Sequence, residues 1–387
     1  MENFEYCTPT RVLFGKGQIE ELPSRIGAYG KKILFAYGGG SIKKIGLYDK
    51  IKSLLSEYTL YELSGIEPNP KLKSVEEGAK ICKEKGIEVV LAVGGGSVLD
   101  CSKAIAAAAC YDGDAWDLIT HKAPTERALP VVTVLTLSAT GSEYDWGAVI
   151  SRPDTEDKVG YIDPHLFPVL SVLDPQYTFT VSAKQTAAGA ADIMNHVIEQ
   201  YFTSPSNYLA DGISESIMKT VIKYAPVAVK QPENYEARAQ LMWASSLGCN
   251  GIAGLGNKPS GWPCHGIEHA LSGYYDITHG EGLAIVTPRW MRHILSDRTM
   301  ERFVSFGTGV WGISREKSDR AIAEEAIAKT EAFFLSLGMP MTLKEVGIGK
   351  ERIGEMAKHI ADNEGLESAY APLTQKDIEA ILLNCLQ

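Results

Sequence analysis

Residues 87–109, IEVVLAVGGGSVLDCSKAIAAAA, contain the pattern that decides the fold of the N-terminal half of this 387-residue chain. The run at 87–93, which is apolar except for Glu88, is typical of a strand that is buried on both faces. Three glycines and a serine follow it, and the alanine-rich run after them has helical spacing. The stretch therefore predicts a β-strand, a glycine loop and an α-helix, the unit from which parallel sheets are built.

The same order of elements recurs along the first half of the chain. Strand-like runs stand at 31–37, 129–136 and 168–174, and the first of them is also followed by Gly-Gly-Gly-Ser. We predict a Rossmann-like α/β domain over residues 1–178, with a parallel sheet covered on both faces. Strand signals fade after Pro175. Helical patterns at 184–203, 208–228, 234–250 and 316–337 predict an all-helical domain over 179–387, whose first helix begins after Ser182.

Composition limits the classes of function. The formal net charge of -10 argues against a nucleic-acid-binding protein, which would need a basic surface. No apolar run reaches the roughly 18 residues of a membrane span, and the start has no secretory-signal pattern. The seven cysteines form no CxxC pair, which favours reduced thiols and a cytoplasmic protein.

Histidines concentrate in the second half of the chain, in a pattern that suits a metal ion. Asp192 and His196 lie four residues apart, and so do His265 and His269. His279 follows beside two glycines, which we expect to let the backbone turn sharply. On a helix this spacing places both side chains of a pair on one face. One carboxylate and several imidazoles suit Zn²⁺ or Fe²⁺. Taken singly, His196 is better explained as a hydrogen-bonded core residue, but two such pairs together with the His-Gly segment favour a metal site. The spacing leaves open whether His265, His269 or both bind the metal.

The two glycine loops are candidate nucleotide sites. Glycines between a strand and a helix let the backbone approach a phosphate, although tight turns also use glycine for geometry alone. The hydroxyl-rich stretch TLSATGSE at 136–143 follows a third strand. The first loop offers Gly38, Gly39 and Ser41, followed by Lys43 and a second lysine, with no carboxylate to repel a 2′-phosphate. This chemistry favours NADP over NAD.

With these motifs in place, the chain resembles the iron-containing (type III) alcohol dehydrogenases, most closely their butanol-dehydrogenase branch. The resemblance runs nearly end to end. It includes PTRVLFGKG at 9–17, GIEPNP at 65–70, VGGGSVLDCSKAIA at 93–106, TLSATGSE at 136–143, LDPQYTF at 173–179, AADIMNHVIEQYF at 190–202 and CHGIEHALSGYYDITHG at 264–280.

The resemblance implies a dehydroquinate synthase-like fold and assigns residues by motif position. It implies that the metal ligands are Asp192, His196, His265 and His279, and that His269 lies beside them without ligating. It also implies that the cofactor is bound by Asn69, Gly95, Gly96, Ser97, Asp100, Thr136, Ser138, Thr140, Lys158 and Tyr177. Relatives that prefer NAD often carry Asp at the position of Gly39, so glycine there agrees with NADP but does not exclude NAD.

The implied activity is hydride transfer between a nicotinamide and a short- to medium-chain primary alcohol or aldehyde, such as butanol or butanal. A divalent cation, Fe²⁺ or Zn²⁺, would polarise the substrate oxygen. His269 is the candidate proton relay, because an unperturbed imidazole titrates near 6.5. Trp146 is a candidate wall of the substrate pocket, or a core tryptophan.

Two other functions fit parts of the pattern: a metal- and NAD-dependent lyase of the dehydroquinate synthase type, and a metal hydrolase or non-catalytic metal-binding protein. The lyase would need a basic pocket for a phosphorylated substrate, and the hydrolase would not need the glycine loops. The segment FEYCTPTRVLFG at 4–15 is expected to form an edge hairpin, and an exposed edge invites pairing with another chain. The resemblance implies a homodimer joined there.

Overall fold

The computed structural model describes residues 1–203 and 206–387. The chain divides into two compact units. The α/β unit comprises residues 7–181 and 231–246, and the helical unit comprises residues 1–6, 182–230 and 247–387. The predicted boundary between residues 178 and 179 stays a prediction.

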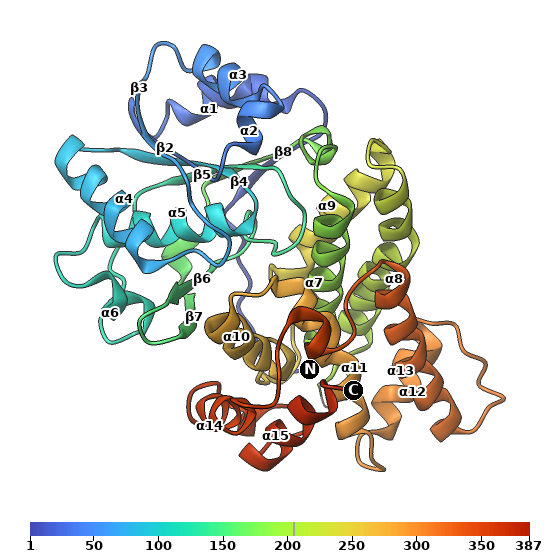
Figure 1. Cartoon of the computed structure of the whole chain (residues 1–387). Coiled ribbons are helices and arrows are strands. Elements are labelled where there is room, and N and C mark those ends of the chain that lie inside the picture. The colour runs from blue at the N-terminus through green and yellow to red at the C-terminus, as the bar shows by residue number, and fades with distance from the viewer. Residues whose placement is uncertain (204–205) are drawn as a thin grey trace. The chain divides into compact units, whose positions relative to one another are not determined.

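The α/β unit is built on a six-stranded parallel sheet, which confirms the predicted fold class (Figure 1). In sheet order its strands are β1 (Arg11–Phe14), β8 (Leu170–Leu173), β5 (Val131–Leu135), β4 (Val89–Gly94), β2 (Lys32–Tyr37) and β3 (Thr59–Leu63). Helices α1 (Leu22–Ile26), α2 (Ser41–Lys44), α3 (Leu47–Leu54), α4 (Leu72–Lys85), α5 (Gly96–Ala108) and α6 (Ala115–Ile119) connect them. Because the strands are parallel, the loops after β2, β4 and β5 leave the sheet at the same edge.

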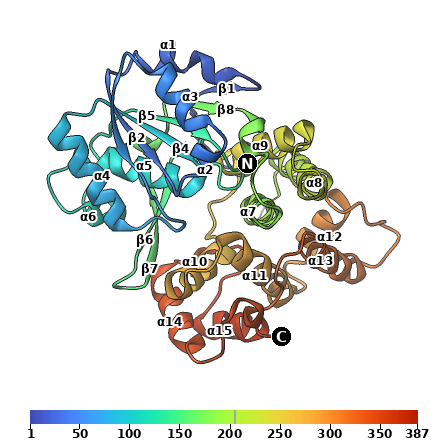
Figure 2. The ribbon, with the colours of Figure 1, turned by 45° about the horizontal axis from the view of Figure 1, so that its top comes forward.

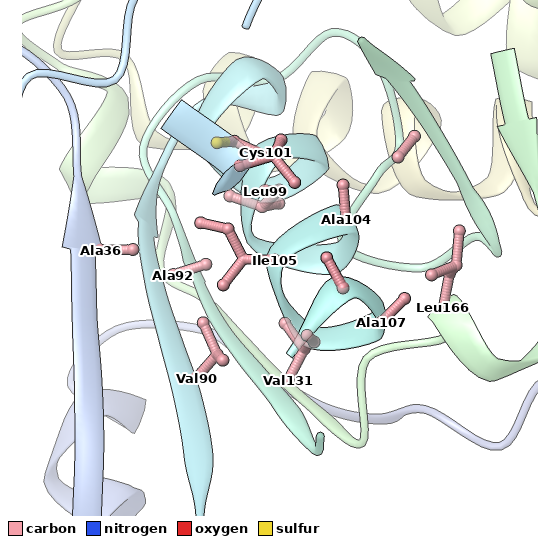
Figure 3. Packing of buried hydrophobic residues seen from close by; sticks show 14 of the residues in the cluster. Ala36, Val90, Ala92, Leu99, Cys101, Ala104, Ile105, Ala107, Val131 and Leu166 are labelled. Carbon is pink, nitrogen blue, oxygen red and sulfur yellow. The ribbon is translucent and has the colours of Figure 1, made fainter. Parts of the chain in front are cut away.

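Alternation along the central strands fills two cores, one on each face of the sheet. Val90 and Ala92 of β4 pack with Leu99 and Ile105 of α5 on one face (Figure 3). Their neighbour Leu91 belongs to the other core, which includes residues of α1 and α3. Since both faces are buried, the strands carry the continuous apolar runs by which the sequence predicts them.

Two features of the α/β unit differ from the sequence-based expectation. Residues 4–15 form no hairpin, because β1 is a single edge strand that pairs in parallel with β8. The hairpin lies instead at β6 (Gly147–Arg152) and β7 (Asp157–Ile162), an antiparallel pair that the sequence analysis did not predict. Helix α9 (Tyr235–Cys249) contributes its residues up to 246 to this unit.

All regular elements in the described part of the helical unit are helices, as predicted. They are α7 (Ala183–Tyr201), α8 (Tyr208–Lys230), α10 (Pro263–Tyr275), α11 (His279–Ile294), α12 (Met300–Gly309), α13 (Asp319–Ser336), α14 (Ile353–Asn363) and α15 (Gln375–Asn384), besides short 3₁₀ turns. Helix α7 packs against α8 and α11, and α11 also contacts α10, α13 and α15 (Figure 2). None of the helices in the described ranges has the length and apolar character needed to cross a bilayer.

Candidate metal centre

Helix α7 carries the first two predicted ligands. The helix begins where the Ser182 hydroxyl accepts the backbone N–H of Gln185 at 3.2 Å, as the predicted cap requires. Asp192 and His196 are both buried, and the Nε2 atom of His196 lies 3.5 Å from Oδ1 of Asp192. The four-residue spacing thus places the two side chains together on one helix face.

Two further imidazoles converge on the same carboxylate oxygen. Oδ1 of Asp192 lies 3.7 Å from Nε2 of His265 on α10 and 3.5 Å from Nε2 of His279, the first residue of α11. The donor atoms of Asp192, His265 and His279 all lie within 4.8 Å of one another. His196 falls outside that group of three, but its ring stacks on His265 with centroids 4.7 Å apart. The four residues therefore surround one small region of the helical unit.

Two buried atoms that point into this region have no hydrogen-bond partner in the part of the chain that the structure describes. Among the described residues, Oδ1 of Asp192 and Nε2 of His265 are buried without one. An unpaired buried polar atom is costly, and facing acceptor atoms cannot pair with each other. A carboxylate and three imidazole nitrogens facing inward are the donor set that a divalent cation such as Fe²⁺ or Zn²⁺ takes. The residues present thus fit a metal ion.

The electrostatics of the site favour a positive charge next to Asp192. Burial alone would raise the pKa of Asp192, but the three neighbouring histidines hold it well below its usual range. Burial lowers the pKa of His196 to about 3. Burial would also lower the pKa of His265, yet the charges of Glu199 and Asp192 outweigh it and raise that pKa to about 9. The carboxylates of the site thus favour positive charge close to Asp192, which suits a bound divalent cation.

Two carboxylates that the sequence analysis missed lie directly behind the imidazoles. Glu199 binds Nδ1 of His265, and Glu268 binds Nδ1 of His279. Both glutamates are buried, at 3% and 0% exposure. The signal was available in the sequence, because a glutamate within an apolar helical run needs a partner. The partner of each glutamate could not be predicted from the sequence, since each of these hydrogen bonds joins two different helices.

The glycines beside His279 serve a purpose other than the expected sharp turn. Gly280 and Gly282 lie within α11, and neither has a positive φ. A Cβ atom on Gly282 would lie 2.7 Å from Cγ of Glu268. Glycine therefore makes room for the glutamate that binds His279, and the expectation of a turn was wrong.

Two more side chains lie beside the predicted ligands. The centroid of the His269 ring lies 6.3 Å from that of the His265 ring and 6.0 Å from that of the His279 ring. The Nδ1 atom of His269 is 3.9 Å from Oε2 of Glu364. Its place next to the cluster agrees with the non-ligating role that the resemblance implies, which stays a prediction. The partly exposed Trp262 packs against His265 with ring centroids 5.1 Å apart.

The α/β unit brings the predicted cofactor residues to one edge of its sheet. Gly38, Gly39 and Ser41 follow β2, while Gly95, Gly96 and Ser97 lie between β4 and α5 or in its first turn. Thr136, Ser138 and Thr140 follow β5, and a Cβ atom on Gly96 would lie 2.4 Å from Cγ2 of Thr140. Glycine at position 96 is thus needed for the loop after β4 to contact the loop after β5.

The remaining predicted cofactor residues are spread around these loops. Asp100 is buried on α5 and accepts the backbone N–H of Val149 at 2.9 Å, which indicates a structural bond to β6. Asn69, with a φ of 47°, follows β3, while Lys158 is buried on β7. Tyr177 lies in the 3₁₀ turn Pro175–Thr178, and Trp146 packs on Phe167 with ring centroids 5.3 Å apart. Their cofactor and pocket roles stay predictions.

Comparison with known proteins agrees with both halves of the chain. Residues 9–175 match the family described as iron-containing alcohol dehydrogenase, and residues 186–386 match the Fe-containing alcohol dehydrogenase family, C-terminal. The chain is 50% identical to NADH-dependent butanol dehydrogenase A of Clostridium acetobutylicum over 382 residues, covering 98% of each chain. It is 40% identical to the NADPH-dependent aldehyde reductase YqhD of Escherichia coli, covering 94% of each.

A solved structure gives the same result. The crystal structure of NADH-dependent butanol dehydrogenase A from Thermotoga maritima has a TM-score of 0.96 and 37% sequence identity, covering 100% of this chain and 99% of that one. The agreement therefore extends over the sheet, the helices and the segments that carry the predicted ligands. This chain belongs to the iron-containing alcohol dehydrogenase family.

Proposed function

We propose that this NAD(P)-dependent alcohol dehydrogenase interconverts short- to medium-chain primary alcohols, such as butanol, and their aldehydes. The observation that carries the proposal is the convergence of three Nε2 atoms, at 3.5, 3.7 and 3.5 Å, on one buried oxygen of Asp192. The name of the Clostridium relative, butanol dehydrogenase, supports the substrate class.

The four predicted ligands would hold one divalent cation. When bound, it would act as a Lewis acid on the alcohol or carbonyl oxygen. His196 and His265 are buried while His279 is partly exposed, which keeps most of the site dry. We assign His269 the transfer of the alcohol proton toward solvent. His269→Ala should lower turnover strongly while the metal content persists; unchanged turnover across pH would remove His269 from the mechanism.

The nicotinamide cofactor would bind at the carboxyl edge of the sheet, on the loops after β2, β4 and β5. We propose NADP(H) as the preferred form, because the first loop has Gly39 and no carboxylate. Among the relatives, the Clostridium enzyme is named as NADH-dependent and the E. coli enzyme as NADPH-dependent. Steady-state comparison of NADPH with NADH decides the preference.

Absorbance at 340 nm tests the reaction itself. Enzyme reconstituted with Fe²⁺ or Zn²⁺ should consume NAD(P)H when butanal is added, and Asp192→Asn should abolish this consumption. A lyase that returns its hydride within one turnover would give no net consumption. A metal hydrolase or a non-catalytic metal-binding protein would bind metal but neither NADH nor NADPH.

We further propose a cytoplasmic homodimer. All seven cysteines are free, which suits a reducing compartment. The β1 edge carries Phe14, which is 38% exposed, and an open parallel edge can pair with a second copy. Sedimentation should show particles of twice the 42.1 kDa chain mass, and single chains at micromolar concentration would contradict the dimer.

A further inference from the structure

We propose that Glu199 and Glu268 are positioning residues that set the metal affinity of the centre by orienting His265 and His279. This inference rests on the metal centre proposed above. Each glutamate acts through the imidazole that it binds at Nδ1.

Glu199 is fixed from two directions before it meets its histidine. Its Oε1 atom accepts the backbone N–H of Cys264 at 2.6 Å and that of His265 at 3.4 Å, both in the first turn of α10. Its Oε2 atom is then left for Nδ1 of His265. Glu199 lies on α7 with Asp192 and His196, so this one side chain ties the helix of two ligands to the helix of the third.

Glu268 performs the corresponding task between α10 and α11. Its Oε1 atom accepts the hydroxyl of Ser272, and its Oε2 atom binds Nδ1 of His279. The same hydroxyl is shared with the carbonyl oxygen of Ile277, which lies 3.2 Å from Oγ of Ser272. Since Gly282 leaves space for the Glu268 side chain, the sequence around His279 accommodates this carboxylate.

An ionised carboxylate can only accept hydrogen bonds, so the bound Nδ1 atom must donate. When the ring is neutral, as a metal ligand must be, its Nε2 atom keeps a lone pair, and in both histidines that atom faces Asp192. The carboxylate also makes the ring a stronger electron donor to a metal. Glu199, Glu268 and Asp192 together place three buried negative charges where a divalent cation would be bound.

His196 provides a contrast within the same centre. Its Nδ1 atom is buried without a hydrogen-bond partner among the described residues. Two of the three imidazoles are therefore oriented by carboxylates and one is not. Removing either carboxylate should weaken metal binding by about 10- to 100-fold, the usual effect of losing such a partner.

The test measures metal binding to the full-length protein by competition with a chromophoric chelator, using Zn²⁺ as the probe. Glu199→Gln and Glu268→Gln remove the charge at nearly constant volume, and both should weaken Zn²⁺ binding by about 10- to 100-fold. Glu281→Gln is the matched control. Glu281 is buried on α11, two residues from His279, but its carboxylate pairs with Lys184 at 2.8 Å. Its substitution should leave the affinity unchanged.

The visible d–d bands of the Co²⁺-substituted protein separate orientation from general stability. They report the ligand field, so they should shift in both glutamine variants and stay constant in the control. Lower affinity with unchanged bands would reduce the glutamates to structural residues and overturn the proposal. If Glu268→Gln does not fold, Glu268→Ala, which removes the carboxylate altogether, is measured in its place.

Two further results keep this inference apart from the proposed function. Wild-type affinity in both glutamine variants, together with loss of binding in Asp192→Asn, would refute the positioning role and leave the metal centre intact. If Asp192→Asn binds Zn²⁺ as tightly as the wild-type protein, the proposed centre itself is wrong, and the positioning role with it.

Discussion

A Cβ atom on Gly280 would lie 2.1 Å from the carbonyl oxygen of Ala188. Gly280 follows His279 on α11, and Ala188 precedes Asp192 by one turn of α7. The close approach of these two helices therefore depends on the absence of a side chain at position 280. It also fixes how near His279 comes to Asp192.

We expect Gly280→Ala to push α11 away from α7. Overpacking of this kind costs about 1–3 kcal/mol. It should also lower the metal content, because His279 would move away from the other ligands. Urea unfolding and metal analysis of the purified protein measure the two effects.

Gly212→Ala is the control for this substitution. Gly212 lies on α8 with open space at its Cβ position, so alanine there should stabilise the helix by about 0.5–1 kcal/mol. A Gly280→Ala protein with wild-type metal content would show that the helices can adjust, and that their contact does not position His279.

Local patterns explain what the sequence could predict. The strands β2, β4 and β5 are buried on both faces, so their apolar runs are continuous and easy to recognise. Asp192 and His196 stand out because their spacing is that of one helix face. The hairpin β6–β7 lacks such a run, since half of its residues are only partly buried. The roles of Glu199, Glu268 and Gly280 were missed because each depends on a neighbour in another helix.

Glu143 should make the stability of the protein depend on pH. Burial raises the pKa of this carboxyl from 4.5 to about 7. Its Oε1 atom accepts the Ser246 hydroxyl at 2.5 Å, while Asp145 raises the pKa and Lys103 lowers it. Because the pKa is higher in the folded state, the folded protein holds this proton more tightly. The stabilisation is complete below pH 4.5 and declines as the pH rises to about 7.

Between pH 4.5 and about 7, the free energy of unfolding should decline by up to roughly 1.4 kcal/mol per pH unit because of Glu143. Glu143→Gln, which cannot ionise, should lose this part of the pH dependence. The free energy of unfolding is measured for both proteins from pH 5 to about pH 8. The difference between the two curves isolates Glu143 from all other titrating groups. Parallel curves would mean that Glu143 does not titrate in this range.

Gly39→Asp should shift the cofactor preference toward NADH. A Cβ atom at Gly39 meets nothing within 4 Å and the backbone there has no positive φ, so aspartate fits without strain. A carboxylate near the end of such a strand accepts the ribose 2′-hydroxyl and repels a 2′-phosphate. We expect NADPH binding to weaken by about tenfold or more, equivalent to 1.4 kcal/mol, while NADH binding is kept. Fluorescence titration with each cofactor measures the two dissociation constants.

The uncharged variant Gly39→Asn is the appropriate comparison. It has nearly the volume of aspartate but cannot repel a phosphate, so its loss of NADPH affinity should be clearly smaller. Equal weakening of NADPH and NADH by Gly39→Asp would indicate that the loop is merely disturbed. The first loop would then have no part in selecting the cofactor.

Trp262 should limit the size of the substrate. Its indole lies against two of the predicted ligands, with ring centroids 5.8 Å from His196 and 5.1 Å from His265. It directly precedes Pro263, the first residue of α10, and is partly exposed. An aldehyde whose oxygen lies at the metal must extend its hydrocarbon chain along the apolar surfaces around the metal. We expect Trp262→Ala to raise KM for butanal. The substitution should also increase kcat/KM for branched and aromatic aldehydes relative to kcat/KM for butanal.

The measurement is kcat/KM over a series of linear, branched and aromatic aldehydes, with metal content determined for each preparation. Trp262→Phe keeps an aromatic ring and should fall between the wild-type enzyme and the alanine variant. Trp146→Ala, tested in parallel, examines the other candidate wall. If Trp262→Ala lowers kcat/KM for every aldehyde by the same factor, the indole shields the His196–His265 pair and does not select substrates.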